Sequence, residues 1–271
     1  MFWASWRRWV ANDIHLDHPD WDTTMNEEYR SFMENDTWDL VPLPKGIKLV
    51  RCKWVYQTKY ASYGSIKRHK ARLVAKGFSQ VESIDYNETF APVAKMNSIY
   101  LVLSLAASHK WELYQMYVKS AFLHGDLKEE IYMEQPLGYV QNESSLVCHL
   151  KKSLYGLKQA PRSWYAKMDK FLIDTGFFRC HSDPNVYTKK VGNHLIIIVL
   201  YVHDLFLIVS EPRILTHVKS ILKKKIPFPS LSMIVTFFNT FTWKFLNNPL
   251  LPSSLESNFL PPVLLPKWMS L

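Results

Sequence analysis

A stretch of basic residues in the first third of the chain has the composition of a polyanion-binding surface. Residues 45–76 carry ten lysines and arginines and no aspartate or glutamate. Lysine and arginine bind phosphate groups, and aromatic rings stack on nucleobases. The aromatic residues that alternate with these cations are Trp54, Tyr56, Tyr60 and Tyr63. The stretch predicts a nucleic-acid-binding surface, although charge alone leaves open a basic surface without a ligand.

The composition of the whole chain agrees with a polyanionic partner and excludes other classes. Its 271 residues carry a formal net charge of +9 and are 48% hydrophobic, which is typical of a globular protein rather than a disordered one. Only 8 residues are glycine, and neither a GxxxxGK[ST] nor a GxGxxG motif occurs. A glycine-rich nucleotide loop is therefore not expected.

Cysteine usage and hydropathy indicate a soluble protein in a reducing compartment. The N-terminal residues lack the apolar core and cleavage site of a signal peptide. The longest apolar stretch, 195–209, is interrupted by His203 and Asp204 and is too short to span a bilayer. The cysteines are too widely spaced for a zinc site and odd in number, at Cys52, Cys148 and Cys180. We expect a cytoplasmic protein with no membrane partner.

A β-hairpin is predicted to position the basic stretch. Two extended segments, 48–60 and 66–78, are joined by a short loop. Gly64 in that loop can supply the positive φ angle that a tight turn requires. The cations on the two segments would then share one small sheet.

The remaining elements alternate between helices and strands. Helical spacing predicts helices over 25–35, 98–109 and 161–175, the second of them capped by Ser98. Strands are expected over 113–119, 131–134, 146–150, 185–190, 194–202 and 205–210, with a turn at 121–126. The last two strands can form a hairpin with His203 and Asp204 at its tip. The mixed order indicates an α+β fold.

The composition changes abruptly after residue 225. Residues 226–271 contain seven prolines, only three charged residues and no sustained 2- or 3.6-residue period. Such a segment does not readily build a regular element. We interpret 211–271 as a degenerate tail, either adhesive or translated out of frame. Residues 1–24 are expected to be irregular, and 25–210 to form the folded unit.

Seven sequence blocks match the copia-type retrotransposon reverse transcriptase family in the same order and at similar spacing. They are ENDTWDLVPLPKG (34–46), KWVYQTKY (53–60), RHKARLVAKGFSQ (68–80), IDYNETFAPVAK (84–95), QMYVKSAFLHGDLKEEIYMEQPLGY (115–139), CHLKKSLYGLKQAPRSWY (148–165) and LYVHDLFLIV (200–209). One block alone would be moderately specific, but seven in order are highly specific. Over about residues 20–210 the chain therefore resembles a reverse transcriptase domain.

The resemblance implies an α+β right-hand polymerase fold with fingers and palm, and with the thumb absent or degenerate. The basic hairpin would form the fingers, and the strands at 113–119 and 194–210 would form the centre of the palm. The implied activity is RNA-directed DNA polymerisation on an RNA or DNA primer–template with dNTP and Mg²⁺. The implied location is the cytoplasm, a virus-like particle or the nucleus. No oligomeric state is indicated.

This chain departs from the family pattern at the metal-binding aspartates. The family places one aspartate at the end of the first palm strand and a pair at a hairpin tip. The matching residues here are Tyr117, His203 and Asp204, so only one carboxylate remains. Tyrosine, with a pKa of about 10, is neutral at pH 7, and neutral imidazole is a poor Mg²⁺ ligand. We predict that metal binding and catalysis are impaired. Substitute ligands would have to come from Asp126, Glu129 or Glu130, which on the family pattern point elsewhere.

The resemblance carries further site residues over one by one. Lys70, Arg72 and Lys76 fall where the fingers contact the triphosphate, although solvated strand charges are an alternative. Phe122, with Ala121 beside it, falls at the bulky residue that excludes a ribose 2′-hydroxyl, or it is a core residue. The loop that packs against the template base and nucleotide matches Tyr155, Gly156 and Gln159. Trp164 and Tyr165 are interpreted as helix core.

Three functions fit these features. The first is a polymerase domain by descent that is catalytically inactive. The second is a non-enzymatic nucleic-acid-binding remnant, and the third is an unstable pseudogene product. Each aspartate replacement requires a single-base codon change, so the replacements and the tail together are typical of mutational decay.

Overall fold

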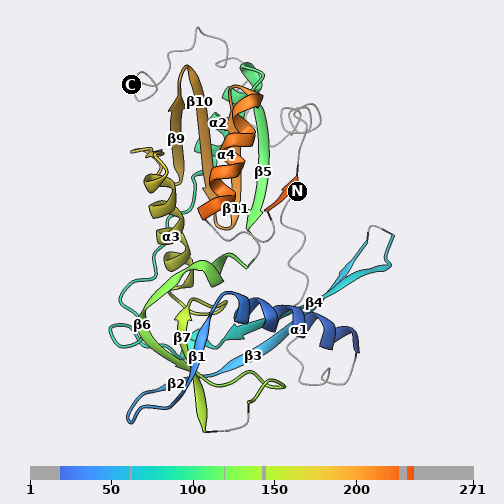
Figure 1. Ribbon diagram of the computed structural model, residues 1–271, viewed down its shortest axis with the longest axis vertical. Coiled ribbons are helices and arrows are strands. Elements are labelled where there is room, and N and C mark those ends of the chain that lie inside the picture. The colour runs from blue at the N-terminus through green and yellow to red at the C-terminus, as the bar shows by residue number, and fades with distance from the viewer. Residues whose placement is uncertain (1–18, 62, 119, 142–144, 226–230, 235–271) are drawn as a thin grey trace.

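The computed structural model describes residues 19–61, 63–118, 120–141, 145–225 and 231–234. Figure 1 shows two parts along the long axis of the molecule. One contains a six-stranded sheet with helices beside it, and the other contains helix α1 (Pro19–Glu34) with two smaller sheets. The architecture mixes helices with largely antiparallel sheets, which confirms the predicted α+β class.

The six-stranded sheet is antiparallel throughout and has helices on both faces. Its strand order is β12 (Leu231–Ile234), β5 (Glu112–Val118), β11 (Asp204–Val209), β10 (His194–Tyr201), β9 (Val186–Val191) and β8 (Phe178–Arg179). Helices α3 (Ala160–Asp174) and α4 (Pro212–Lys225) pack on one face, and α2 (Met96–Ser108) packs on the other.

Strand β10 shows why the sequence forms this arrangement. Ile196 and Ile198 are buried with residues of α3 and α4, whereas Ile197 and Val199 are buried with residues of α2. Successive side chains of a strand point to opposite faces. A continuous apolar run is therefore what a strand covered on both faces requires.

The second part of the molecule carries the basic hairpin. A four-stranded sheet has the order β1 (Trp38–Pro42), β7 (Leu146–Lys152), β6 (Asp126–Met133) and β2 (Leu49–Val50), and β2 and β6 are parallel. Strands β3 (Cys52–Tyr60) and β4 (Ile66–Ala75) form a separate two-stranded antiparallel sheet. The turn between them contains Gly64 at φ 86°. The hairpin prediction is confirmed.

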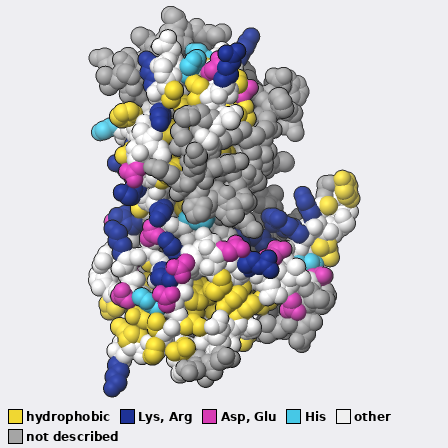
Figure 2. Space-filling view, viewed as in Figure 1, with side chains coloured by type: hydrophobic (Ala, Val, Ile, Leu, Met, Phe, Trp, Pro, Cys, Tyr) yellow, Lys and Arg dark blue, Asp and Glu magenta, His cyan; other side chains and the backbone are white. Residues whose placement is uncertain are grey.

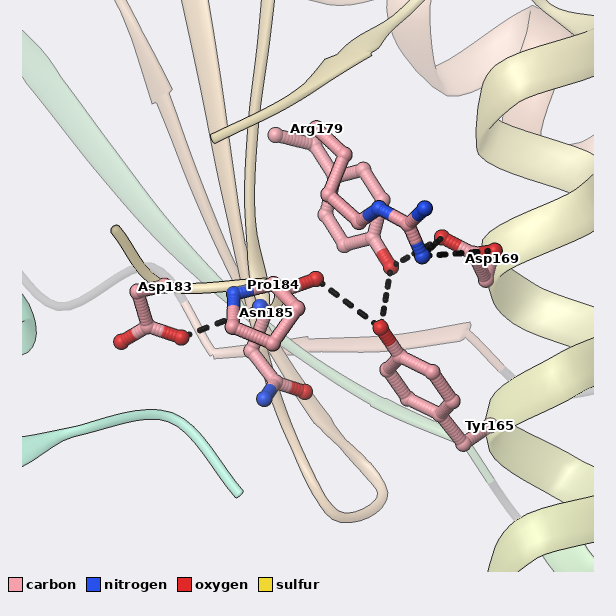
Figure 3. A network of polar contacts seen from close by, with 7 residues as sticks. Tyr165, Asp169, Arg179, Asp183, Pro184 and Asn185 are labelled. Carbon is pink, nitrogen blue, oxygen red and sulfur yellow. Dashed lines mark hydrogen bonds and ion pairs between the residues drawn. The ribbon is translucent and has the colours of Figure 1, made fainter. Parts of the chain in front are cut away.

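A polar network fixes α3 against the large sheet, as Figure 3 shows. The Tyr165 hydroxyl donates to the Pro184 carbonyl at 3.1 Å, and the Tyr187 hydroxyl donates to Asp169 at 2.9 Å. Arg179 lies 3.3 Å from the same Asp169 carboxylate. Together with the full burial of Trp164, these contacts confirm the interpretation of this helix face as structural.

Several predicted boundaries differ from the structure. Helix α1 begins at Pro19 rather than at residue 25, because Trp21 and Met25 belong to one buried face of the helix. Helix α2 starts after Lys95, so Ser98 is not its cap, and no side-chain hydrogen bond caps it. Strand β6 begins at Asp126, within the predicted turn, because it pairs with β7 from that residue.

The segment after residue 210 is more regular than its composition predicted. Leu215 and Val218 of α4 are buried against the large sheet. Strand β12 pairs with β5, with Leu231 opposite Val118. The expectation that no regular element follows residue 225 is wrong for 231–234, because pairing with an existing strand supplies order that local periodicity does not. Residues 1–18 and 235–271, on which the other terminal predictions fall, lie outside the described residues.

Two glycines allow the hairpin base and the loop at 153–159 to touch through their backbones. Gly156 has φ 93°, and a Cβ atom there would lie 2.1 Å from the Ala75 carbonyl oxygen. A Cβ atom on Gly77 would lie 2.0 Å from the Gly156 carbonyl oxygen. The Ala75 amide also donates to the Tyr155 carbonyl at 2.8 Å. Any side chain would force these segments apart.

We expect Gly156→Ala to lower the free energy of unfolding by about 2–3 kcal/mol, because it adds a backbone clash to a positive φ angle. The matched control is Gly192→Ala, at φ 60° with no heavy atom within 4 Å of its Cβ position. That control measures only the loss of stability that an alanine suffers at a positive φ angle, which is about 1 kcal/mol. Urea unfolding of both variants measures the difference, and equal losses would contradict the prediction.

Candidate active site

The three residues at the family's aspartate positions lie together where β5 meets the turn between β10 and β11. Tyr117 is directly opposite Asp204 in the antiparallel pair of β5 and β11. The Val118 amide donates to the His203 carbonyl at 3.0 Å. The Tyr117 and His203 rings are 5.0 Å apart and nearly perpendicular. The structure thus places the three residues close together, as the family resemblance implied, and their chemical role remains a prediction.

The surroundings of the His203 imidazole disfavour its charged form. Burial lowers the pKa of His203, and the positive charges of Lys70 and Arg72 lower it further, while Asp204 opposes the shift. The His203 Nε2 atom lies 4.0 Å from the Asp204 carboxylate. Gln115 donates to the other oxygen of that carboxylate at 3.3 Å. The Tyr117 and His203 rings thus stand beside the Asp204 carboxylate.

This donor set does not suit Mg²⁺, the ion that the reverse transcriptase family generally uses. Mg²⁺ prefers several hard oxygen ligands. Of the three side chains here, a carboxylate, a phenol and an imidazole, only the carboxylate is a ligand of that kind. Within the described ranges, no group of three His, Cys, Asp or Glu side chains could hold a metal ion. The residues present therefore do not fit the two-ion site that the family resemblance implies.

The substitute carboxylates are engaged by other partners. Asp126 accepts hydrogen bonds from Lys152 and Lys167, and these lysines lower its pKa although burial alone would raise it. The Glu130 carboxylate lies 2.8 Å from His149 Nε2 on β7. Asp126 is thus neutralised by cations of β7 and α3.

A buried ion pair connects α1 with the predicted triphosphate-contacting residues. Arg72, a residue 7% exposed, donates from its guanidinium to the carboxylate of Glu28, a residue 4% exposed. It also lies over the Tyr155 ring, 5.1 Å from the ring centroid. Burial alone would lower the pKa of Arg72, but Glu28, Tyr155 and Tyr117 raise it. Sequence reasoning missed Glu28, since nothing local in the sequence links it to a residue 44 positions away.

Tyr155 joins this pair to Phe122. Their ring centroids are 4.9 Å apart at 66°, an edge-to-face contact. Burial raises the pKa of Tyr155 to about 12, so the phenol is neutral. Phe122 packs against the core between the six-stranded sheet and α3 and also against the core beneath the hairpin, and Ala121 beside it is buried. The structure thus brings Arg72, Tyr155 and Phe122 into one row of contacts, and their proposed roles remain predictions.

Gln159 is buried within the protein. Gln80 donates to its side-chain oxygen at 3.1 Å, and Gln159 donates to the Asp85 carbonyl at 3.2 Å. These bonds tie the 153–159 loop to the segment after the hairpin. Gln159 is 1% exposed, so a nucleotide contact from its side chain would require the segments that cover it to move.

Lys70 stands in an environment that disfavours its charge. Burial, followed by the nearby charges of Arg72 and Lys59, lowers the pKa of Lys70 to about 8. An ordinary lysine has a pKa of about 10.4. Excess positive charge at this face would be relieved by an anion.

We expect Lys70 to be acetylated by trace acetic anhydride with a midpoint near its pKa of about 8, because only the neutral amine reacts. Rising pH removes the proton, so the labelled fraction increases through that midpoint. Peptide mass spectrometry compares Lys70 with exposed Lys67 in the same digest. Labelling of Lys70 that rises only above about pH 10, the ordinary lysine range, would contradict the lowered pKa.

The predicted aromatic partners of the basic stretch separate into two pairs. Trp54 and Tyr56 are buried, and the Trp54 indole donates to the Leu137 carbonyl at 2.9 Å. They belong to the core beneath the hairpin, so their assignment to a nucleic-acid surface is wrong. Tyr60 and Tyr63 are 64% and 91% exposed. Spacing along a strand cannot distinguish the two pairs, because the first pair is covered by rings from other parts of the chain, Trp21 beside Tyr56 and Tyr139 beside Trp54.

The fold and site define an α+β protein with a basic hairpin beside a lone carboxylate at a strand turn. Residues 35–242 match the family model described as "Reverse transcriptase (RNA-dependent DNA polymerase)". The chain is 47% identical over 221 residues to the retrovirus-related Pol polyprotein from transposon TNT 1-94 of Nicotiana tabacum. It is 41% identical over 197 residues to that from transposon RE1 of Arabidopsis thaliana. The chain belongs to the reverse transcriptase family, as a domain of the copia-type Pol polyproteins.

The chain spans only a small part of the polyproteins that it matches. The match to the tobacco protein covers 80% of this chain but 17% of that polyprotein, and the match to the Arabidopsis protein covers 72% and 13%. A solved structure of apo telomerase from Candida tropicalis aligns at a TM-score of 0.36 and 8% identity, over 79% of this chain and 54% of that one. That similarity is too weak to support an argument. Within the described ranges, none of the helices has both the length and the hydropathy that crossing a membrane requires.

Proposed function

We propose that the two parts of the structure are the fingers and the palm of a reverse transcriptase domain. The basic β3–β4 hairpin would be the fingers, and the six-stranded sheet would be the palm. Residues 25–210 would form the main unit, which the first residues of α1 and the whole of α4 extend. The family match ends at residue 242, so we restrict the proposed out-of-frame tail to residues 243–271.

We propose further that this domain does not transfer nucleotides. The observation that carries the proposal is the register of β5 and β11, which sets Tyr117 rather than a carboxylate opposite Asp204. In the family, bound Mg²⁺ would activate the primer hydroxyl and bind the triphosphate. The phenol of Tyr117 and the imidazole of His203 do not replace the two carboxylate ligands that this ion would need.

Primer extension tests the proposal directly. With Mg²⁺ or Mn²⁺, dNTP and an RNA or DNA template, we expect the native chain to extend a primer no faster than its Asp204→Ala variant. Denaturing gel electrophoresis over hours measures both proteins at equal concentration. Extension by the native chain well above that variant would show that the site works despite the replacements.

A second function, nucleic-acid binding without catalysis, is favoured by the exposed cations of the hairpin. Lys53, Lys67 and Arg68 are exposed on β3 and β4. Phosphate binding by such residues releases counterions, so affinity falls steeply with salt. A filter-binding series with primer–template tests this, and the absence of any affinity at low salt would exclude it.

A further inference from the structure

A largely apolar cavity lies between helix α3, the six-stranded sheet and residues 89–93. Its volume is about 300 Å³, and its aromatic lining residues are Phe90, Phe122, Trp164 and Tyr165. The largest gathering of hydrophobic side chains on the face in Figure 2 lies over the part of the molecule with the two smaller sheets, whereas this cavity lies beside α3. Of the residues predicted to contact a nucleotide, only Phe122 lines it. The cavity is therefore a different surface from the row of Arg72 and Tyr155.

The outer wall of the cavity is tied to α3 by one arginine. Arg162 forms an ion pair with Glu88 at 2.5 Å and donates to the Phe90 carbonyl at 3.3 Å. These two contacts come directly before residues 89–93, which line the cavity opposite the helix. The cavity is thus bounded by a held segment rather than by a free loop end.

One polar side chain in the lining lacks a partner. Asn185 is 1% exposed, and its Nδ2 atom has no hydrogen-bond partner among the described residues. Its backbone is fixed, because its amide donates to the Asp183 carboxylate at 3.0 Å and its carbonyl accepts from the Leu200 amide at 2.9 Å. Figure 3 shows the Asn185 side chain pointing away from the network around Asp169. A buried amide without an acceptor is costly, so an acceptor that enters the cavity would be favoured.

The remaining polar groups of the lining favour an apolar ligand over water. The Trp164 indole donates to the Val202 carbonyl at 2.6 Å, and the Tyr165 hydroxyl donates to the Pro184 carbonyl at 3.1 Å. A buried water molecule needs two or more polar partners, which these engaged donors do not supply.

The size and the rings of the cavity indicate the class of ligand. A cavity of about 150 Å³ holds a benzene molecule. A volume of about 300 Å³ therefore has room for an aromatic ring with a short substituent. Aromatic rings pack favourably against one another in edge-to-face or offset arrangements.

We propose that this cavity binds a compact aromatic molecule with a carbonyl group, whose ring packs among Phe122, Trp164 and Tyr165 and whose oxygen accepts a hydrogen bond from Asn185 Nδ2. The inference goes beyond the proposed function and does not depend on it, because neither nucleic acid nor a metal ion takes part in this binding.

Two small molecules of nearly equal shape test the proposal on the full chain. Acetophenone has the carbonyl group, and α-methylstyrene has a methylene group in its place. Ligand-observed NMR titration measures both dissociation constants. For the native chain we expect acetophenone to bind with a Kd of about 1 mM, a value within reach of so small a ligand.

Asn185→Leu keeps the shape of the side chain and removes the donor. We expect the ratio of the two dissociation constants to shift about tenfold against acetophenone in this variant, because one hydrogen bond is lost. Exchanging an unpaired buried amide for an apolar group of the same shape should leave thermal unfolding almost unchanged. An unshifted ratio in the folded variant would overturn the proposal.

Ala91→Phe tests the location of the site independently. Ala91 lines the cavity, so a larger side chain there should weaken the binding of both molecules at least about tenfold. The smaller Ala91→Leu replaces it if the phenylalanine variant does not unfold cooperatively. Undiminished binding in the folded variant, or no binding of acetophenone by the native chain, would overturn the proposal. Neither result would affect the proposed nucleic-acid binding, which the filter-binding series measures separately.

Discussion

Replacing Tyr117 and His203 together by aspartate is expected to raise primer extension at least about 10³-fold, because metal-binding carboxylates act as a unit. The two new carboxylates would join Asp204 where β5 meets the β10–β11 turn. Three converging carboxylates supply the oxygen ligands that Mg²⁺ prefers. Either single replacement should recover little, since one missing ligand leaves the site incomplete.

The experiment needs a control for the new charge alone. The double variant combined with Asp204→Ala carries more negative charge than the native chain but lacks the third ligand, so it should stay inactive. Calorimetric titration with Mn²⁺ gives a second measurement that does not depend on turnover. A double variant that unfolds cooperatively yet neither binds Mn²⁺ nor extends a primer would contradict the prediction.

Replacing Glu28 by alanine is expected to destabilise the protein by about 3–5 kcal/mol, because it leaves a buried guanidinium unpaired. Arg72 is 7% exposed and cannot recover its hydration without opening the contact between α1 and β4. For a chain of this size, that loss lowers Tm by roughly 10 °C. Thermal unfolding followed by circular dichroism measures it.

Two further variants identify the cause of the loss. Glu27→Ala removes an exposed carboxylate one position away on the same helix and should change stability by less than about 0.5 kcal/mol. Glu28→Leu combined with Arg72→Met removes both charges and should recover much of the stability, because apolar replacements of a buried pair are often neutral. Equal effects of the Glu27 and Glu28 changes would contradict the assignment.

The hairpin and the central sheet could be predicted because their signals are local. Gly64 marks the turn between β3 and β4, and the apolar run of β10 forms a strand buried on both faces. The proximity of Tyr117 to Asp204 came from the resemblance rather than from any pattern within the chain. Strand pairing across 87 positions leaves no local trace.

The features that sequence reasoning missed depend on how segments that are distant in the sequence pack against one another. The Glu28–Arg72 pair and the burial of Trp54 both result from the packing of the hairpin against other segments of its domain. Strand β12 forms because β5 offers it a free edge, and its own residues show no strand periodicity. Each of these is a tertiary effect that overrides composition.

The stability of the fold does not depend on the residues at the altered aspartate positions, Tyr117 and His203. Tyr117 lies near the end of β5 and His203 in the turn between β10 and β11. Neither belongs to the hydrophobic core on the two faces of the six-stranded sheet or to the core beneath the hairpin. Clustered carboxylates repel one another, so losing two of them costs the folded state little. Natural selection for a stable domain would therefore not remove these substitutions. The proposed loss of catalysis therefore need not bring a loss of the folded domain.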